Sequence, residues 1–594
     1  MNKSYSPWLS RGLLKSINET NRLYKKFVRS PTTYCELKYK TYKNKLNHLI
    51  RIAKRIYYDS KLEDAKNDLR TTWKLLNEVI NKSKNYPSPP SSFKSDGKTI
   101  TDPMDIADRF CKYFTNIGPN LASAIPSENS ATFRSFLGSR DYPPIILKPT
   151  DIRELQNICS MFSPRKAPGY DNISMRMIQH SFHLISTPLV NIINLSLSKG
   201  IFPDKLKIGK VIPIYKTEDP SLFVNYRPIS LLPNFSKFFE KVMYNCLVDF
   251  AETNEIFYLR QFGFRKNHST SHALIHLLNK ISSAINRHET TVGIFLDLSK
   301  AFDTLNHEIL FSKLEHYGIR DVALQWINSY FSNRYQFVQF NQTCSTMQTI
   351  KCGVPQGSIL GPLFFILYIN DLPNASELID LLLFADDTSI FYSHSNPNTL
   401  ESVLNDELKN IEVWLRCNKL SVNVKKTTYL IFKPRQKKCN HKFSISLGSQ
   451  LLTQTNATKF LGVYIDEHLT WKDHISYLCK QMSKSIGMLF RSRFYLSSKT
   501  KLTLYYSLIY PYITYCNSTW SSTYVTNLNR IYCLQKRAVR AITNSDYRAH
   551  SCSLIPQIRN FRHVSNKYVS NSEIYVLFPQ QPVASIVCQL VSNK

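Results

Sequence analysis

The chain has 594 residues, too many for a single hydrophobic core, and its hydrophobic content of 43% is enough for several folded domains. Its 76 Lys and Arg residues outnumber 43 Asp and Glu residues, which gives a net charge of +33 at pH 7. A solvated basic surface is a poor explanation for so large an excess. The charge instead indicates a polyanionic partner, either a nucleic acid or an acidic membrane surface.

The apolar runs and the cysteines help to decide between a nucleic acid and a membrane surface and to place the protein in the cell. The longest apolar runs, such as GPLFFILYI, are far shorter than the ~20 residues that span a bilayer, so we expect no membrane partner and favour a nucleic acid. The 13 cysteines are scattered, without a C-x-x-C pair or zinc-finger spacing, and the N-terminus has no signal peptide. These features predict reduced thiols in an intracellular protein of the nucleus or cytoplasm.

The N-terminal part of the chain has a helical pattern. Neither Gly nor Pro occurs between Pro31 and Pro87, Lys and Arg are dense, and apolar residues such as Leu46 and Leu49 recur at spacings of three and four. This pattern predicts one long or two shorter amphipathic helices with a basic face. Such a face is either solvated or lies along a phosphate backbone. The stretch YPSPPSS, residues 86–92, indicates a linker.

From about residue 150, short strands alternate with helices. Runs rich in β-branched and aromatic residues predict strands at 210–216, 291–299, 381–385 and 388–393, with helical patterns at 236–252 and 398–418. The mixture fits an α/β or an α+β fold. After about residue 475 the pattern is helical again, at 474–494, 499–516 and 534–543. The last forty residues have no clear period and are unassigned.

Two adjacent carboxylates interrupt an apolar stretch. In LLLFADDTSIF, residues 381–391, Asp386 and Asp387 stand between two apolar runs. Carboxylates near apolar surface are costly to ionise, and each opposes ionisation of its neighbour. A bound cation would resolve this conflict, whereas an acidic surface turn would avoid it.

A second carboxylate follows another apolar strand. Asp297 comes directly after Val292 to Leu296, and Asp303 lies six residues further on. If this strand lies beside the 381–391 hairpin, three carboxylates converge on a site suited to Mg²⁺, whose remaining ligands would be waters and substrate phosphates. Two such ions about 4 Å apart serve an in-line phosphoryl displacement. Two separate surface turns are the alternative.

Three of the 16 glycines, Gly353, Gly357 and Gly361, gather between the two acidic segments. Their spacing also occurs in membrane helix dimers, but Pro355 and Pro362 interrupt it. The pattern favours a loop that lets a flat ligand, such as a nucleobase or sugar, approach the backbone, followed by a helix from residue 363.

The order of these segments resembles a known family. FLDLSKAFD, GVPQGSILGPLFFILYINDL and FADDTSIF resemble motifs A, B and C of reverse transcriptases of jockey-like and CR1-like non-LTR (LINE-type) retrotransposons. Flanking segments are similar to the fingers at 163–174, 211–242 and 261–270, and to motifs D and E at 418–432 and 459–471. Segments at 7–17 and 114–122 resemble the part that precedes the polymerase in such elements, so the resemblance covers roughly residues 1–550.

The resemblance implies a role for each carboxylate. Asp297 and Asp386 would be metal ligands, and Asp387 the third acidic residue of a catalytic and metal site that binds two Mg²⁺ ions, with Mn²⁺ as a substitute. Asp303 would support the local fold rather than bind metal. The implied reaction is RNA-directed DNA synthesis, in which dNTPs are added to the 3′-hydroxyl of a DNA primer on an RNA template.

The resemblance also implies nucleotide-binding residues, which are Lys216, Arg227, Phe302, Gln356, Gly357 and Lys426. The ring of Phe302 would collide with a ribose 2′-hydroxyl, although a role in core packing is compatible with this. The two fingers cations would grip the triphosphate, with ordinary surface charges as the alternative. Lys426 would lie near the leaving pyrophosphate, and the adjacent Lys425 is an open alternative.

The implied architecture is an α+β right-hand polymerase with fingers, palm and thumb and a helical N-terminal extension. The expected parts are a basic helical extension at 1–86, a linker and pre-fingers segment at 87–150, a reverse transcriptase domain of fingers and palm at 195–466, a helical thumb-like region at 470–550, and an unassigned, truncated tail at 551–594. Complete elements carry an endonuclease before the polymerase, and we expect this chain to lack it.

Two other functions are considered beside the active polymerase. A catalytically silent remnant that still binds nucleic acid is the alternative if the tail is damaged. A polymerase with a similar palm, such as an intron maturase, is disfavoured by the jockey-like leading segment. The sequence does not determine the template RNA, the target site or the oligomeric state.

Overall fold

The computed structural model describes residues 6–65, 68–79, 90, 92–95, 97–126, 131–216, 218–434 and 441–550. The expected tail at 551–594 and most of the expected linker at 86–92 lie outside the described residues. The chain divides into two compact units. The smaller comprises residues 1–86, 463–465 and those from 470 onward, and the larger comprises 87–462 and 466–469.

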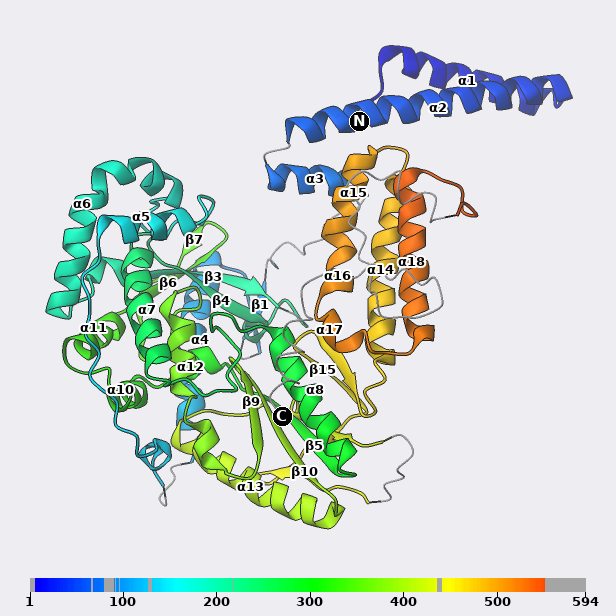
Figure 1. The fold of residues 1–594 in the computed structure, drawn as a ribbon. Coiled ribbons are helices and arrows are strands. Elements are labelled where there is room, and N and C mark those ends of the chain that lie inside the picture. The colour runs from blue at the N-terminus through cyan, green and yellow to red at the C-terminus, as the bar shows by residue number, and fades with distance from the viewer. Residues whose placement is uncertain are drawn as a thin grey trace. The chain divides into compact units, whose positions relative to one another are not determined.

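The larger unit is built around a five-stranded sheet (Figure 1). Its order is β14-β11-β5-β10-β9, formed by Thr453–Gln454, Thr428–Phe432, Thr290–Asp297, Asp387–His394 and Asp380–Phe384. All pairs are antiparallel except β11 with β14. The strand β5 is buried along nearly its whole length and becomes exposed only at its last residue, Asp297. A strand with this burial pattern delivers a carboxylate to solvent at the edge of a core.

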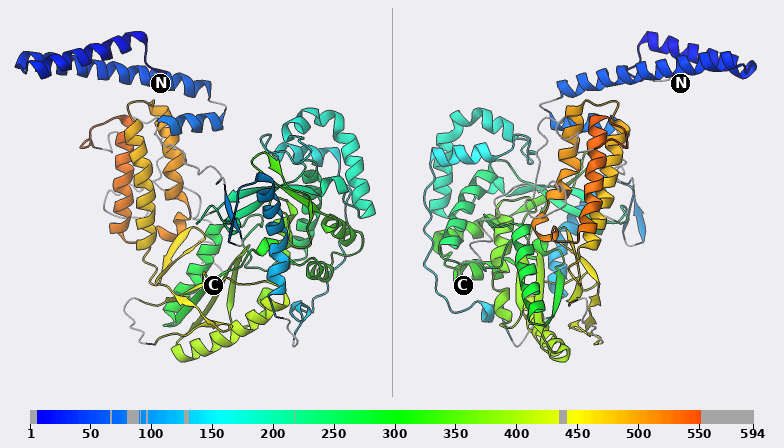
Figure 2. Two further views of the ribbon diagram at one scale, coloured as in Figure 1. Left: turned by 180° about the vertical axis from the view of Figure 1, so that it is seen from behind. Right: turned by 45° about the vertical axis from the view of Figure 1, so that its right-hand side comes forward.

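Helices enclose this sheet. The helix α8 (Thr270–Asn286) contacts β5 and β9, and α13 (Pro397–Cys417) contacts β10 and runs beneath the strands in the views of Figures 1 and 2. The helix α12 (Leu360–Tyr368) is apolar on every side and lies in the main core, together with residues of α7 (Ser236–Thr253). Because a helix of this composition has no face for water, it must be buried.

A second sheet contains β4 (Tyr226–Leu231), β3 (Ile208–Tyr215), β6 (Tyr335–Phe340) and β7 (Thr343–Cys344) in that order, with β8 (Gln348–Thr349) also paired to β6. The helix α4 (Pro103–Ser123) packs on β6 and β7. A separate aromatic core joins them, in which the ring of Phe110 lies 4.6 Å from that of Phe223 and 5.6 Å from that of Phe340.

Further short elements complete the larger unit. Its other helices are α5 (Ile152–Met161), α6 (Met175–Lys199), α9 (Ala301–Thr304), α10 (His307–His316) and α11 (Asp321–Phe331). Its other strands are β1 (Phe93–Ser95), β2 (Lys98–Ile100), β12 (Ser446–Leu447), β13 (Gln450–Leu451) and β15 (Ala457–Phe460). Its 3₁₀ turns are Phe133–Phe136, Asp204–Leu206, Phe223–Asn225 and Leu372–Ala375.

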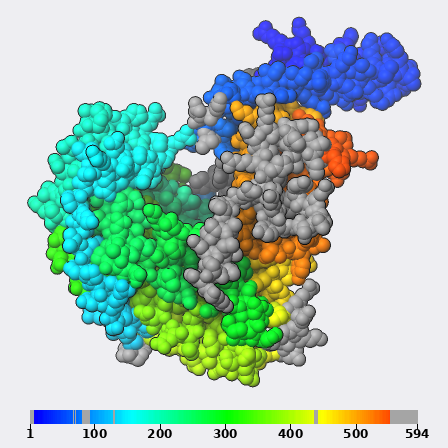
Figure 3. Space-filling view, in the orientation of Figure 1, coloured from blue at the N-terminus to red at the C-terminus, as the bar shows by residue number. Residues whose placement is uncertain are grey.

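The smaller unit is mainly helical. It contains α1 (Arg11–Arg29), α2 (Thr33–Asp64), α3 (Leu69–Val79), α14 (Lys472–Ser492), α15 (Ser498–Leu508), α16 (Tyr510–Thr514), α17 (Asn517–Trp520) and α18 (Val525–Thr543), with most of β16 (Val463–Asp466). The helices α1 and α2 pack on each other, and Figure 3 shows their side chains, in blue, on the surface. The ammonium group of Lys54 lies 4.1 Å above the ring of Tyr495, which ties α2 to the segment after α14.

A buried cation joins the ends of two helices in this unit. Lys501, on α15, is fully buried, and its Nζ donates to the carbonyl oxygens of Arg493 and Ala541 at 3.3 Å and to Asn544 Oδ1 at 2.8 Å. These acceptors lie at the C-terminal ends of α14 and α18, where helix dipoles favour positive charge. Burial lowers the pKa of Lys501 to about 8.

The predicted elements are confirmed with shifted ends. All four strands occur, as β3, β5, β9 and β10, and the N-terminal pattern forms two helices, α2 and α3, rather than one. The helix expected from residue 363 instead begins at Leu360, because the buried carboxylate of Glu240 accepts the N–H groups of Ile359 and Leu360 and so caps the earlier turn. The segment 499–516 breaks into α15 and α16, with Pro511 in the first turn of the second helix.

The mixture of helices with mainly antiparallel sheets is consistent with the expected α+β fold. No helix among the described residues is both long and apolar enough to cross a membrane. The structure shows no disulfide among the cysteines that it describes, and the reduced state of the thiols stays a prediction.

Candidate active site

The strand that carries Asp297 lies beside the acidic hairpin, as the sequence predicted. In the register of β5 and β10, Asp297 stands directly opposite Asp387. Ala385 and Asp386 form the two-residue turn between β9 and β10, and Ala385 has a φ of 57°. Such a tight turn requires a left-handed residue at this position, and it presents Asp386 at the tip of the hairpin.

A buried glutamine holds this turn in place. The side-chain Oε1 of Gln261 accepts the N–H of Ala385 at 3.2 Å and the N–H of Gly263 at 2.9 Å. A Cβ on Gly263 would lie 2.3 Å from the backbone nitrogen of Ala385, so only glycine permits this approach. The segment around Gln261 therefore supports the backbone from which Asp386 projects.

The segment before β11 braces the other carboxylate. The N–H of Asn423 donates to the carbonyl oxygen of Asp297 at 2.8 Å, and the N–H of Asp297 donates to Thr427 Oγ1 at 3.3 Å. The N–H of Lys426 in turn donates to the Asn423 carbonyl oxygen at 3.0 Å. These bonds keep the backbone of Lys426 close to that of Asp297.

A cavity of about 720 Å³ brings most of the predicted site residues together. Eight of the nine line it, namely Lys216, Arg227, Asp297, Phe302, Gln356, Gly357, Asp386 and Lys426. The exception is Asp387, which contributes none of the lining although it is the cross-strand neighbour of Asp297. Asp386 lies in the turn, whereas Asp387 begins β10 and shares a face of the sheet with Asp297, its cross-strand neighbour.

The cavity holds charges of both signs close together. Burial lowers the pKa of Lys216, and the neighbouring charges of Arg227 and Lys426 lower it further. Burial likewise lowers the pKa of Lys300. The nearby carboxylates, Asp297 and Glu218 for Lys216 and Asp303 for Lys300, offset these effects only in part, so a polyphosphate would stabilise the cations.

The acidic residues are perturbed in the opposite direction. Burial raises the pKa of Asp386, and the nearby charge of Asp297 adds to the effect. Burial, followed by the charges of Asp386 and Asp297, raises the pKa of Asp387 to about 6. Carboxylates that are destabilised in this way would gain from a bound cation.

The two loops that carry Phe302 and Gln356 are hydrogen-bonded to each other. The N–H of Val354 donates to the carbonyl oxygen of Phe302 at 2.9 Å, and the Gln356 amide nitrogen donates to Asp303 Oδ1 at 2.8 Å. The ring of Phe302 also stacks on Phe365 of α12, with 4.7 Å between ring centroids. The packing alternative for Phe302 is therefore correct, and the same ring lines the cavity.

Sequence reasoning missed several supporting residues. Lys300 and Asn423 line the cavity, and Gln261 and Thr427 hold the backbones of the two carboxylate-bearing segments. Lys300 and Asn423 lie inside the motifs that resemble A and D, which was the only signal available for them. Gln261 and Thr427 also lie in resembling segments, at 261–270 and 418–432, but each bonds to a residue that is distant in the sequence, so no local pattern reveals its role.

The donor set suits a divalent metal but does not enclose one. Carboxylate oxygens are the ligands that Mg²⁺ prefers. Among the described residues, no three His, Cys, Asp or Glu side chains are placed to hold a metal ion on their own. Asp297 and Asp386 could therefore supply only part of a coordination shell, and substrate phosphates and water would complete it.

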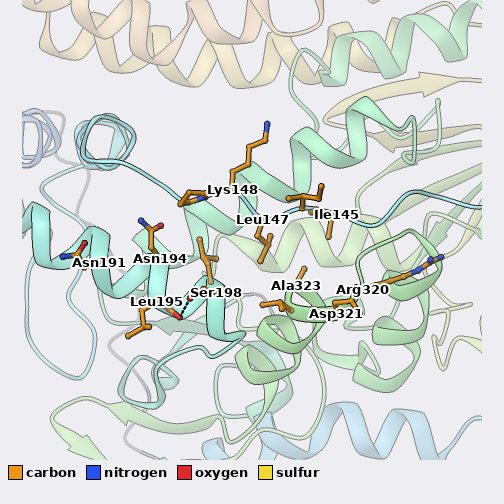
Figure 4. Close-up of a pocket in the computed structure, with 14 residues that line it drawn as sticks. Ile145, Leu147, Lys148, Asn191, Asn194, Leu195, Ser198, Arg320, Asp321 and Ala323 are labelled. Atoms are coloured by element: carbon orange, nitrogen blue, oxygen red, sulfur yellow. Dashed lines mark hydrogen bonds between the residues drawn. The ribbon is translucent and has the colours of Figure 1, made fainter.

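A second cavity of about 720 Å³ lies elsewhere in the larger unit (Figure 4). The extended residues 145–149, the C-terminal half of α6 and the start of α11 form its walls. It contains none of the predicted site residues, and Asp321 is its one carboxylate. A pocket without convergent charged groups is the weaker candidate for catalysis.

Comparison with known proteins agrees with the resemblance found in the sequence. Residues 215–465 match the family model described as reverse transcriptase (RNA-dependent DNA polymerase), so this part of the chain belongs to that family. All nine predicted site residues lie within the match. Enzymes of this family generally use divalent metal ions.

The similar proteins come from mobile elements. The probable RNA-directed DNA polymerase from transposon BS of Drosophila melanogaster is 29% identical over 69% of this chain and 46% of that protein. The RNA-directed DNA polymerase from mobile element jockey is 25% identical in D. melanogaster, over 96% of this chain and 63% of that protein, and 27% identical in D. funebris, over 88% and 59%.

The assignment to reverse transcriptases of non-LTR retrotransposons is thereby confirmed. The chain spans less than two thirds of the length of each of these relatives. The expected lack of an endonuclease stays a prediction.

Proposed function

We propose that this chain is an RNA-directed DNA polymerase that adds dNTPs to the 3′-hydroxyl of a primer on an RNA template. The observation that carries the proposal is the single cavity in which Asp297 and Asp386 lie with Lys216, Arg227 and Lys426. Carboxylates for a metal and cations for phosphates are the two needs of nucleotidyl transfer. The match of residues 215–465 to the reverse transcriptase family supports the same reaction.

We assign the carboxylates to metal binding. Asp297 and Asp386 would hold two Mg²⁺ ions, which Mn²⁺ could replace, and Asp387 would act beside them as the third acidic residue. When bound, such a pair of ions supplies the activation of the primer hydroxyl and the neutralisation of charge that phosphoryl transfer requires. The bonds from Asn423 and Thr427 to the backbone of Asp297 support this role, because they fix the position of its carboxylate.

The remaining cavity residues would bind the nucleotide. Lys216, directly after β3, and Arg227, on the adjacent strand β4, would grip the triphosphate, and Lys426 would lie near the leaving pyrophosphate. Phe302 would exclude the ribose 2′-hydroxyl, because its ring is fixed by Phe365 and cannot swing away. Gln356 and Gly357 would line the side of the base and sugar.

We propose a right-hand polymerase architecture for the chain. The five-stranded sheet with the acidic hairpin corresponds to the palm, the second sheet with β3 and β4 to the fingers, and the helices from α14 onward to the thumb. The helices α1 and α2 form a basic N-terminal extension. The net charge of +33 supports an RNA template and a DNA primer as partners. Action in the nucleus or cytoplasm would follow from these partners.

Primer extension tests the proposal. The purified chain is given a poly-A RNA template, a complementary DNA primer, dTTP and Mg²⁺, and the products are sized on a gel. We expect extension by the wild type, and loss of at least about 10³-fold in rate when Asp386→Ala and Asp387→Ala are combined. Replacing Mg²⁺ by Mn²⁺ should retain activity, and chelation should abolish it.

A matched variant controls for the loss of negative charge. Asp406 is exposed on α13, and its one ion pair within the described part of the chain is with Lys409 at 2.8 Å, so Asp406→Ala should extend the primer like the wild type. If the folded wild type binds primer-template but does not extend it, the chain is the silent remnant instead. The sequence argument for that alternative rests on residues after 550, which lie outside the described part of the chain.

A further inference from the structure

Asp303 is a carboxylate in the active-site region to which the resemblance assigns only local structural support. It lines the candidate cavity, six residues after Asp297, at the end of the turn that carries Phe302. Its Oδ1 accepts the amide of Gln356, whereas its Oδ2 is buried and no donor among the described residues reaches it. Burying a carboxylate with one unpaired oxygen costs free energy of folding, so we expect the one hydrogen bond that it makes, to Gln356, to serve a function.

Gln356 is fixed at both its backbone and its side chain. Its carbonyl oxygen accepts the N–H of Ser230 on β4 at 2.8 Å. The next residue, Gly357, has a φ of 132°, and a Cβ there would lie 2.5 Å from the Ser230 carbonyl oxygen, so the loop presses directly on β4. With the backbone clamped, the side chain keeps only the freedom that Asp303 allows it.

The bond to Asp303 also decides which end of the amide faces the ligand. A carboxylate only accepts hydrogen bonds, so it must take the Nε2 of Gln356. No hydrogen bond within the described residues uses the Oε1 of Gln356. A small cavity of about 30 Å³ adjoins Asp303 and Gln356 on one side, and the large cavity adjoins them on the other.

We propose that Asp303 is a positioning residue that orients Gln356 so that its Oε1, an acceptor, meets a hydroxyl or N–H donor of the incoming nucleotide. The inference rests on the proposed polymerase function. Without Asp303, the amide would rotate freely and present a donor or an acceptor at random. The nucleotide would then lose one oriented hydrogen bond, and the effect should appear in the KM for dNTP more than in kcat.

A double-mutant cycle tests the coupling. The variants Asp303→Leu and Gln356→Leu should each raise the KM for dNTP by about tenfold, near the upper end for the loss of one hydrogen bond between neutral groups. Because both variants remove the same interaction, the double variant should also lose about tenfold rather than about a hundredfold. Asp303→Asn keeps an acceptor for the glutamine amide and should stay within about threefold of the wild type.

A second pair of variants covers the case in which Asp303→Leu does not fold. Gln356→Glu places two carboxylates in contact and should raise the KM for dNTP by about tenfold or more. Adding Asp303→Asn to Gln356→Glu restores one donor between the two side chains and should recover most of the loss.

The outcomes separate the two hypotheses. The inference is wrong if the increases in KM multiply in the double leucine variant, or if Asp303→Asn does not lower the KM in the Gln356→Glu background. Both results count only while the wild type extends primers. Failure of the wild type to extend any primer would overturn the proposed function and the inference together.

Discussion

The ring of Phe302 lines the cavity that also contains Asp297. The same ring stacks on Phe365 of the core helix α12. A residue with this double contact has a fixed position, which a gate for the sugar requires. The same contacts mean that large changes at this position also affect stability, because they leave a void in the core.

A smaller residue at this position should relax sugar selection. We expect Phe302→Val to lower the preference for dNTPs over ribonucleotides, measured as the ratio of kcat/KM values, by about 10- to 100-fold, because the 2′-hydroxyl no longer meets the ring. The control is Phe311→Val, a substitution of a ring that packs on Phe331 outside the cavity. An unchanged ratio in an active Phe302→Val enzyme would show that the ring serves only the core.

His474 is a buried titratable residue of the smaller unit. It is 2% exposed, its Nε2 has no partner among the described residues, and its ring lies 5.5 Å from that of Trp520. Burial lowers its pKa to about 4. Since this lies below the value near 6.5 of an unfolded histidine, the folded state favours the neutral ring, and protonation favours unfolding.

This shift predicts a loss of stability in acid. The contribution of the neutral ring is fully present above pH 6.5 and is lost as the pH falls from 6.5 to 4, by up to about 3 kcal/mol. Urea unfolding at pH 7 and pH 4.5 should show a smaller acid loss for His474→Phe than for the wild type. Equal losses in both proteins would contradict the shift. The raised pKa values of Asp303 and Asp387 instead favour the folded state in acid. Both carboxylates are present in the wild type and in the variant, so their effect drops out of the comparison.

At the scale of elements, the acidic hairpin depends on a segment that is more than 100 residues earlier in the chain. The parallel bridge of Gln261 with Leu383, and the bond from the Phe262 N–H to the Leu383 carbonyl oxygen at 2.8 Å, place this segment along β9. Gly263 then touches the turn itself. The position of Asp386 is therefore set by packing between segments as well as by the hairpin.

A single methyl group at Gly263 should disturb the site. We expect Gly263→Ala to destabilise the larger unit by about 1–3 kcal/mol and to reduce primer extension, because its Cβ would force the turn outward. The matched control is Gly487→Ala on α14, where no atom lies within 4 Å of the new Cβ. There alanine should be neutral or stabilising by up to about 1 kcal/mol. Thermal unfolding and extension rates distinguish the two, and equal behaviour would refute the close approach of Gly263 to the turn.

At the scale of the whole molecule, charge is the dominant property. The smaller unit carries most of the excess of +33, and the exposed lysines of α2 present part of it to solvent. Partners that are polyanions release counterions on binding, so affinity should fall steeply with salt. A basic face that is merely solvated would contribute nothing to the slope of log K against log salt.

The basic face of α2 can be tested through that slope. Replacing the exposed residues Lys38, Lys43 and Lys45 by Gln should reduce the slope of log K against log salt for duplex primer-template by up to about 0.9 for each phosphate that the variant no longer neutralises. Lys409→Gln, on α13, serves as the control and should leave the slope unchanged. If the triple variant has the wild-type slope, the helix face is solvated and does not bind the backbone.

Local sequence patterns were enough to propose the site residues and to predict the type of each central element. Strand-then-aspartate patterns at Asp297 and at Asp386 predicted β5 and the β9–β10 hairpin, because a period of two and buried apolar runs are local properties. The motifs in their order also led to the family, which the match of residues 215–465 bears out. Composition alone was enough to expect an anionic partner.

Only the tertiary structure decided which residues meet. The pairing of Asp387 with Asp297, the brace from Gln261 and the bond between Asp303 and Gln356 all join segments that are distant in the chain. Local patterns carry no information about such contacts, because they arise from packing and from the satisfaction of buried hydrogen bonds. For the same reason the start of α12 was misplaced, since its cap, Glu240, lies on another helix.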